Sequence, residues 1–233
     1  MRASWATKRI MISGPQVITV QRSGSSFRPG ISRVTTPEAL ERLQEIRRQS
    51  RHVVAIGACA TAGGIQALRN LASVDEYISQ VYATPAFISS LSASTPPSAH
   101  VKIDFELRGC PVDKRQLLDV ILAFLHGRRP DVPAHSVCAE CRMAGQVCVT
   151  VAQGTPCMGP ITHAGCGALC PRYARGCYGC FGPSDAPQPR ALSALWATLG
   201  ATPAETRRAL RSFNTAAPAF DAEARRLEEE ESP

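Results

Sequence analysis

Eight of the ten cysteines in this 233-residue chain lie between Cys138 and Cys180. Their spacing is C-x2-C-x6-C-x8-C, followed by C-x3-C-x6-C-x2-C, which divides them into two sets of four. Proline and glycine interrupt the segment throughout, and few large apolar side chains remain to form a core. A segment of this kind needs a staple in order to fold, and the cysteines are the residues that can provide it.

The spacing predicts that the staple is a pair of cubane iron–sulfur clusters. Such a cluster takes four thiolates, usually from short loops in which glycine lets backbone N–H groups approach the sulfides. The segment supplies seven glycines for such loops: Gly145, Gly154, Gly159, Gly165, Gly167, Gly176 and Gly179. Cys170-Pro171 also repeats a Cys-Pro step found in bacterial ferredoxin loops. The two sets therefore predict two 4Fe-4S clusters.

The sequence leaves two alternatives to iron–sulfur clusters, namely a zinc site and disulfide bonds. Cys138 and Cys141 could pair with Cys177 and Cys180 as one four-cysteine zinc site, but four cysteines would then be left without a role. Disulfides are less favoured because the first residues lack the apolar core and cleavage site of a secretory signal peptide. Under the zinc hypothesis the chain is a stapled interaction module without redox function.

Composition narrows the class of protein further. The net charge of +7 comes from arginines scattered along the chain, with no base-stacking motif, so nucleic-acid binding is not favoured. No apolar run approaches the length that spans a bilayer. We find no nucleophile–base constellation and no phosphate-binding glycine loop, and therefore predict no catalytic residue in this chain.

The part before the cysteine-rich segment is predicted to be α/β. Thr36-Pro37-Glu38 is typical of a helix start, and residues 52–57 form a short buried strand that leads into a glycine-rich turn and a helix from Ile65. Residues 101–107 alternate as a second strand. A helix over 112–126 follows, with its inward face formed by Leu117, Leu118, Ile121, Leu122 and Leu125. Such a unit is typical of a doubly wound domain.

Two further cysteines stand at equivalent places in this α/β part. Cys59 follows the first predicted strand and Cys110 follows the second. Because ligands bind at the carboxyl edge of the strands in such sheets, we expect both thiols to ligate a group there.

The chain therefore divides into four parts. Residues 1–34 have no cysteine and no acidic residue, and are interpreted as an atypical segment, either disordered or outside the true reading frame. Residues 35–133 form the α/β domain and 134–183 the cysteine-rich module. Residues 184–233 form a helical extension, with surface helices over 191–199 and 203–213 and a frayed helix over 219–233.

Three stretches resemble one family. VCAECRMAGQVCVTVAQGTPCMGPITHAGCGALCPRYARGCYGC resembles the two-cluster region of small subunits of cytoplasmic nickel–iron hydrogenases, most closely the delta subunit of NADP-linked sulfhydrogenases. VVAIGACATAGGIQALRN and ELRGCPVDKRQLLDVI are similar to the flavodoxin-like domain that these proteins share with the 20 kDa subunit of NADH:ubiquinone oxidoreductase. The resemblance runs from about Thr35 to about Gly182 and implies a flavodoxin-like domain, incomplete at its amino-terminal end, before the cluster module.

The resemblance implies a role for each cysteine. One set would hold the distal cluster, namely Cys138, Cys141, Cys148 and Cys157; a second would hold the medial cluster, namely Cys166, Cys170, Cys177 and Cys180. Cys59 and Cys110 match the third and fourth ligands of the family's proximal cluster. The first two proximal ligands lie in an amino-terminal CxxC that this sequence lacks, so we expect a proximal cluster that is missing or labile.

The resemblance also implies function and partners. The chain would relay electrons between a nickel–iron large subunit and flavin/NAD(P)-binding iron–sulfur subunits, in a cytoplasmic complex without a membrane or nucleic-acid partner. A related relay subunit of a quinone- or formate-linked complex is the alternative within the same class.

Overall fold

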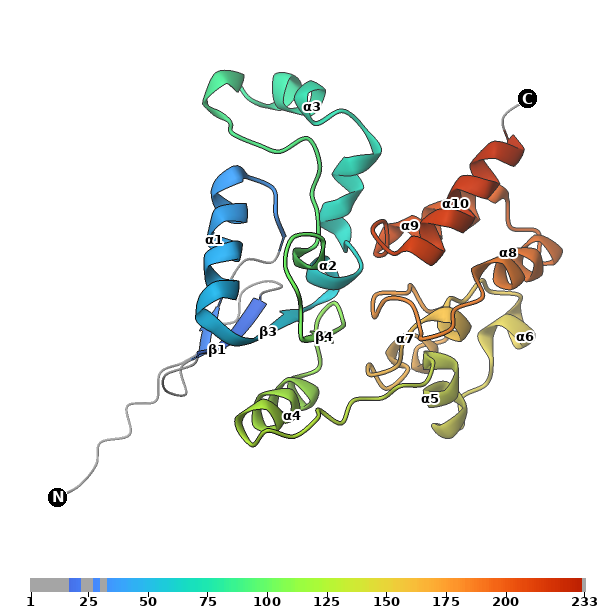
Figure 1. The fold of residues 1–233 in the computed structure, drawn as a ribbon. Coiled ribbons are helices and arrows are strands. Elements are labelled where there is room, and N and C mark those ends of the chain that lie inside the picture. The colour runs from blue at the N-terminus through green and yellow to red at the C-terminus, as the bar shows by residue number, and fades with distance from the viewer. Residues whose placement is uncertain (1–16, 22–26, 30–32, 232–233) are drawn as a thin grey trace.

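The computed structural model describes residues 17–21, 27–29 and 33–231. An α/β unit comes first, a module of short helices and loops follows, and helices from the end of the chain pack against that module (Figure 1). Among the described residues, no helix combines the length and the apolar character needed to cross a membrane.

The sheet has the order β2-β1-β3-β4, formed by β1 (Val17–Gln21), β2 (Phe27–Pro29), β3 (Ser50–Ile56) and β4 (Phe105–Leu107). β1 pairs antiparallel with both β2 and β3, whereas β3 and β4 are parallel. The α/β class predicted from the sequence is confirmed at this level. The parallel pair matters most for the site, because it brings the ends of β3 and β4 to one edge.

β1 and β2 both lie within 1–34, for which the sequence predicted disorder or a wrong reading frame. The run Val17-Ile18-Thr19-Val20 is β-branched throughout, a composition that favours an extended strand. Hydrogen bonding to β3 places this run beside a buried strand. The prediction gave weight to the missing cysteines and acids and overlooked this strand signal; the rest of 1–32 lies outside the described residues.

Helix α1 (Pro37–Gln49) begins where the sequence predicts. The hydroxyl of Thr36 accepts a hydrogen bond from the backbone N–H of Ala39, and Pro37 occupies the first turn. The predicted buried strand is also confirmed, since Val53, Val54, Ala55 and Ile56 of β3 are all buried. This strand carries the chain directly to the turn that contains Cys59.

The connection between the parallel strands is less regular than predicted. The helical segments that follow the glycine-rich turn are α2 (Ala58–Thr61), the 3-10 helix η1 (Ile65–Leu71), α3 (Val74–Val81), and the 3-10 turns η2 (Pro85–Phe87) and η3 (Pro97–Ala99). Extended pairing resumes only at Phe105 and not at Val101. Hydrogen bonds in this stretch join turns, because repeated proline and serine do not support a long helix.

Helix α4 (Lys114–Leu125) is capped by Asp113, whose carboxylate accepts from the N–H groups of Arg115 and Gln116. Its predicted inward face needs correction. Leu117 and Val120 pack against Leu107 and the end of β3, but Leu118 is 58% exposed, and Leu122 and Leu125 are also exposed. The parallel pair β3–β4 is narrow, so it covers only one edge of the broad apolar stripe of α4.

The cysteine-rich module contains α5 (Val137–Met143), α6 (Val149–Gln153), η4 (Gly159–Ile161) and α7 (Leu169–Arg172), joined by loops. An apolar cluster lies under these elements. It joins Val137, Met158 and Ile161 of the module to side chains from the end of the chain. The module therefore has more core than its own sequence provides.

That additional core comes from α8 (Pro189–Thr198), α9 (Pro203–Ser212) and α10 (Pro218–Glu231). Trp196, Leu210 and Phe220 are almost fully buried in it. The prediction of surface helices and a frayed end is therefore wrong for 189–231. The acidic run made α10 look solvated, but it occupies only the last turn of the helix, beyond Phe220, Ala224 and Leu227, which face the core.

Candidate metal centres

The first cysteine set lines one cavity of about 160 Å³, which we call the first thiol cavity. Its thiols come from α5, from the residue that precedes α6 and from the loop before η4: Cys138, Cys141, Cys148 and Cys157. Val137, Val149 and Leu192 complete an apolar wall. An arrangement of four soft sulfur donors around an apolar hollow suits iron–sulfur ligation.

The second set lines a separate cavity of about 190 Å³, the second thiol cavity, with Cys166, Cys170, Cys177 and Cys180. Cys110 from the α/β unit lines the same cavity. The backbone of Cys110 also lies close enough to the thiol of Cys180 to lower its pKa, against the larger effect of burial. The structure thus brings together each of the two sets that the spacing separated, and adds a fifth sulfur to the second.

The two cavities are neighbours. The backbone N–H of Cys177 donates to Sγ of Cys157 over 3.2 Å, and the N–H of Gly179 donates to Sγ of Cys177 over 3.4 Å. Gly176 permits this approach, because a Cβ there would stand 1.9 Å from the carbonyl oxygen of Pro156. Backbone N–H groups therefore already face these cysteine sulfurs, an arrangement that would favour thiolates there.

Burial raises the pKa of several of these thiols. Burial is the main cause at Cys138 and Cys141, and neighbouring cysteines of the first set add to it. Burial also raises the pKa of Cys177, and raises that of Cys180 to about 11. Thiols in such surroundings become thiolates when a cation displaces the proton, so these sites would release protons as a metal cluster binds.

Cys59 and Cys110 meet at the carboxyl edge of the parallel strands, as the sequence predicts. The N–H of Ala58 donates to the carbonyl oxygen of Gly109 over 3.0 Å, which joins the two turns. Cys59 is buried and Cys110 exposed; burial raises the pKa of Cys110, and the nearby Cys59 raises it further. Cys59 does not line either thiol cavity.

Arg33 lies beneath the Cys59 turn and was not recognised in the sequence. Its guanidinium donates to the carbonyl oxygens of Cys59, at 3.0 Å, and Gly63, at 2.7 Å, and bonds to both the hydroxyl and the carbonyl oxygen of Ser94. The side chain is buried, which lowers its pKa to about 10. It fixes the turn without reaching either thiol cavity, and no sequence motif marks it.

The zinc alternative does not match this arrangement. Cys138 and Cys141 open onto the first thiol cavity, whereas Cys177 and Cys180 open onto the second. In the part of the chain that the structure describes, no three Cys, His, Asp or Glu side chains converge closely enough to hold a single ion. The four cysteines of the zinc hypothesis therefore line two different cavities in this structure.

Glu140 is a second residue that sequence reasoning missed. It lies between Cys138 and Cys141 on α5, yet its carboxylate accepts hydrogen bonds from the N–H groups of Gly165 and Ala168, on either side of Cys166. Gly165 is also held through its carbonyl oxygen, which accepts a hydrogen bond from the side chain of Gln116 of α4 over 2.8 Å. An acid between two cysteine ligands in CAEC is the signal that could have identified it.

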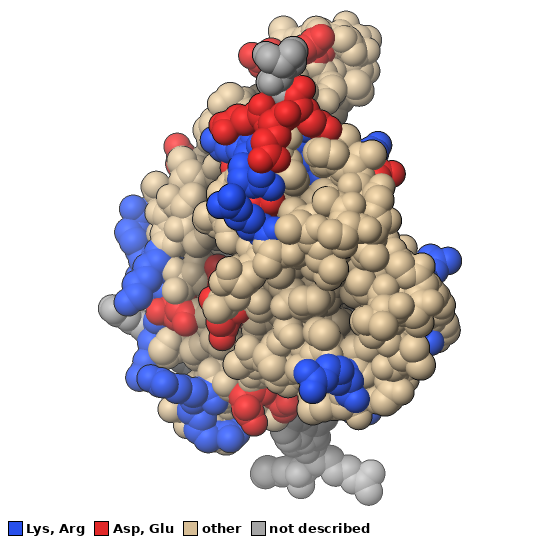
Figure 2. Space-filling view, turned by 90° about the vertical axis from the view of Figure 1, so that its right-hand side faces the viewer, with Lys and Arg blue, Asp and Glu red and all other residues tan. Residues whose placement is uncertain are grey.

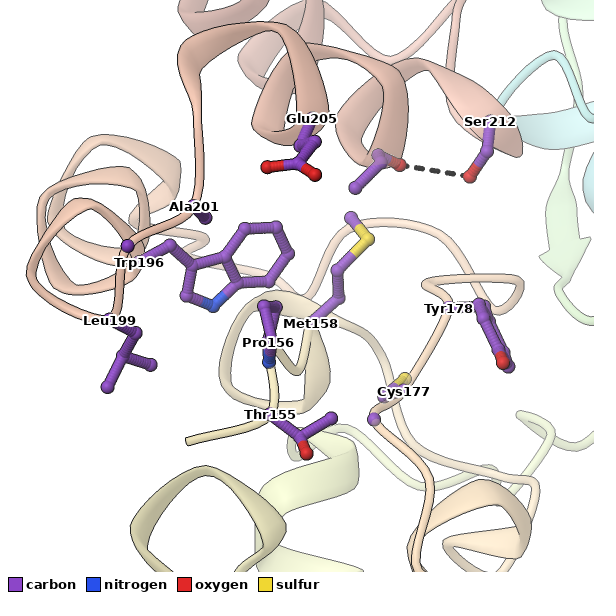
Figure 3. A pocket seen from close by; sticks show the side chains of 13 residues that line it. Thr155, Pro156, Met158, Cys177, Tyr178, Trp196, Leu199, Ala201, Glu205 and Ser212 are labelled. Carbon is purple, nitrogen blue, oxygen red and sulfur yellow. Dashed lines mark hydrogen bonds between the residues drawn. The ribbon is translucent and has the colours of Figure 1, made fainter. Parts of the chain in front are cut away.

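A further hollow of about 470 Å³ lies between the cysteine loops and helices α8 and α9 (Figure 3). Trp196 and Met158 stand in its middle, and Thr155 and Tyr178 lie at its edges. The carboxylate of Glu205 is already engaged in capping α9 at Thr202. The hollow has Cys177 in its wall but holds no set of converging thiols, so it is not a cluster site.

Comparison with known proteins finds a family that part of the chain resembles. The model of the NADH ubiquinone oxidoreductase 20 kDa subunit family matches residues 10–124. The match begins within the amino-terminal segment, earlier than the resemblance noticed at Thr35, and it ends before Cys138.

Relatives extend the comparison. Sulfhydrogenase 2 subunit delta of Pyrococcus furiosus is 36% identical over 151 residues, covering 65% of this chain and 63% of that protein. The iron-sulfur subunit of the F420-non-reducing hydrogenase of Archaeoglobus profundus is 26% identical over 213 residues, covering 68% of this chain and 66% of that protein.

Among solved structures, a chain of the NAD+-reducing [NiFe]-hydrogenase in the H2-reduced state is 30% identical, with a TM-score of 0.41, covering 44% of this chain and 65% of that one. The chain spans 63% and 59% of the lengths of two relatives, the sulfhydrogenase 2 delta subunit and an F420-non-reducing hydrogenase subunit of Methanocaldococcus jannaschii. Its sequence identity to these relatives and the family match at residues 10–124 agree, and over that stretch the chain is similar to the NADH ubiquinone oxidoreductase 20 kDa subunit family.

Proposed function

We propose that this chain is an electron-transfer iron–sulfur subunit of a nickel–iron hydrogenase that holds two 4Fe-4S clusters. The observation that carries the proposal is the pair of neighbouring cavities, each lined by four thiols from one cysteine set. The relatives named as hydrogenase subunits, one of them as an iron-sulfur subunit, support it.

The first thiol cavity would hold the distal cluster and the second the medial cluster. Cys138 and Cys141 present their thiols from one turn of α5, and Cys157 and Cys177 lie on loops held together by their N–H to sulfur bond. Apolar side chains line the first thiol cavity around the thiols, of which Cys157 is buried and Cys148 exposed. When bound, such clusters supply one-electron redox chemistry, and ligation, hydrogen bonds to sulfur and burial set their potentials.

The edge that carries Cys59 and Cys110 would be the proximal position. Arg33 holds the Cys59 turn and the bond from Ala58 to Gly109 holds the two turns together, so the pair is preorganised. Two thiolates are too few for an ordinary cubane. We therefore propose that a proximal cluster on this chain is absent or labile unless a partner completes it.

Apolar side chains surround the exposed end of the first thiol cavity. Cys148 is exposed there, and Val147, Val151 and Met143 stand out into solvent, with Val151 86% exposed. Figure 2 shows that the middle of the face carrying α5, α6 and α8 has few charged side chains. Since exposed apolar patches mark interaction sites, this face supports the proposal of redox partners, namely a nickel–iron large subunit and flavin/NAD(P)-binding subunits in a cytoplasmic complex.

Anaerobic purification of the full chain, separated from any co-expressed subunit that carries iron of its own, tests the function. We expect a brown sample with about eight iron atoms and about eight acid-labile sulfides per chain, the content of two cubanes. Electron paramagnetic resonance of the reduced sample should then give the signals of two interacting clusters. A colourless chain that carries zinc and no labile sulfide would overturn the proposal.

A further inference from the structure

Glu140 belongs to the first cysteine set by sequence and to the second by contact. It stands between Cys138 and Cys141 on α5. Its Oε1 accepts from the N–H of Gly165 over 2.9 Å, and its Oε2 accepts from the N–H of Ala168 over 3.1 Å. Oε2 also lies 3.9 Å from Sγ of Cys166. The carboxylate thus reaches from one set of ligands to the backbone around the other.

The loop that receives it is wound around the carboxylate. Gly165, Gly167 and Ala168 all have positive φ, at 130°, 64° and 54°. Ala168 is fully buried, and that conformation carries a steric penalty of about 1 kcal/mol. Successive N–H groups in such a turn form a concavity that binds anions. The conformation of the Cys166 loop is therefore the one that an ionised Glu140 stabilises.

The negative charge of Glu140 is directed at Cys166 rather than neutralised by a basic side chain. None of the ion pairs found among the described residues involves Glu140. The backbone N–H of Ala168 lies between this carboxylate and the sulfur of Cys166, so the two acceptors share it. Net negative charge beside a cluster lowers its reduction potential, and an N–H drawn from sulfur towards the carboxylate acts in the same direction.

We propose that Glu140 is a positioning residue that shapes the Cys166 loop and, as an anion, holds the reduction potential of the medial cluster low. The inference rests on the proposed function, since it requires a cluster on the second cysteine set. Glu140, which lies between two cysteines of the distal set, would thus adjust the reduction potential of the medial cluster. Each site keeps its own four cysteines, but Glu140 links the first site to the loop of the second.

The test is a redox titration of the full chain in its complex, followed by electron paramagnetic resonance, with iron and sulfide content measured on the same samples. E140Q keeps the shape of the side chain and removes its charge. We expect both clusters to be retained and the one-electron reduction equilibrium of the medial cluster to shift at least tenfold towards the reduced form, which corresponds to about 59 mV. The matched control is E41Q, at an exposed position on α1, which should leave both potentials unchanged.

The possible results distinguish a failure of the Glu140 inference from a failure of the proposed iron–sulfur function. A sample without iron and sulfide in the unmutated chain refutes the proposed function itself. Two intact clusters with an unchanged medial potential in E140Q refute the inference alone. If E140Q loses the medial cluster, E140D decides: retention of that cluster in E140D traces the loss to the missing charge and supports the inference, whereas loss in both variants refutes the role of charge.

Discussion

Cys177 and Cys157 belong to different cysteine sets, yet the backbone N–H of Cys177 donates directly to the sulfur of Cys157 over 3.2 Å. The bond places a donor from one proposed cluster site on a ligand of the other. Hydrogen bonds to ligand sulfur stabilise the more negative state of a cluster, so the loop between the two sets would affect both of the proposed clusters. The packing of that loop is accordingly the first feature to test.

Gly176→Ala should disrupt this junction. The added Cβ would stand 1.9 Å from the carbonyl oxygen of Pro156, which is backbone and cannot move aside without shifting the Cys157 loop. We expect a loss of about 2–3 kcal/mol in the free energy of unfolding, typical of a steric clash in a packed core. Urea unfolding under anaerobic conditions measures it.

Gly154→Ala is the matched control for that variant. Gly154 has φ of 63°, but nothing lies within 4 Å of the position of its added Cβ. Only the conformational penalty remains, about 1 kcal/mol. An equal loss of stability in both variants would contradict the clash at Gly176.

Cysteine substitutions should remove the two clusters independently. Cys141→Ser takes a ligand from the first thiol cavity and Cys170→Ser takes one from the second. Each variant should lose about four iron atoms per chain, and each should lose a different paramagnetic signal. Cys59→Ser is the control, since Cys59 lines neither cavity and should leave the iron content unchanged. Loss of all iron from either single variant would show that the sites are not separable.

Phe220→Ala tests whether α10 is part of the core. Phe220 is fully buried among side chains of α8, α9 and the cysteine module. Removing a buried phenylalanine side chain costs about 3–5 kcal/mol through lost burial and the cavity left behind. Chemical denaturation of the full chain should report that loss. Phe87→Ala removes the same atoms at a position that is 85% exposed, and should change stability by less than about 0.5 kcal/mol.

Asp104 should make stability depend on pH. Its carboxylate accepts from Arg47, over 2.5 Å, and from the N–H of Val53, over 2.8 Å. Burial alone would raise the pKa of Asp104, but these two hydrogen bonds outweigh it and the pKa is lowered. A carboxyl with a lowered folded-state pKa stabilises the fold above its unfolded pKa of about 4 and loses that contribution as pH falls through the folded value.

Asp104→Asn should therefore cost about 1–2 kcal/mol at pH 7, with the difference from the unmutated chain narrowing below about pH 4. Urea unfolding at a series of pH values measures both quantities. Asp131→Asn, at an exposed position, is the control and should run parallel to the unmutated chain. A pH-independent difference for Asp104→Asn would mean that shape rather than charge is responsible.

Local signals in the sequence were sufficient for several features. Thr36 and Pro37 marked the start of α1, the run ending at Ile56 marked the buried strand, and the cysteine spacing separated the two thiol sets. These features depend on neighbours within a few residues of the chain. Such neighbours determine caps, strand runs and short ligand loops directly.

Features that depend on distant partners were missed. Helical periodicity predicted that Leu118 and Leu122 face the core, but both are exposed. The periodicity gives the apolar stripe of a helix and carries no information about the width of the sheet that covers it. The acidic end of α10 concealed the buried side of Phe220. Glu140 looked like an ordinary helix-surface acid, since its contacts come from a loop 25 residues away. Tertiary packing decides each of these, and no local pattern contains it.

The turn that holds Cys59 is completed by residues from the other end of the chain. The N–H of Gly64 donates to the carbonyl oxygen of Phe213, and the N–H of Ala216 donates to that of Ala62. The ribosome makes Cys59 long before it makes Phe213. The backbone around Cys59 can therefore make its full set of hydrogen bonds only after Ala216 has been synthesised, so this turn closes later than its place in the sequence suggests.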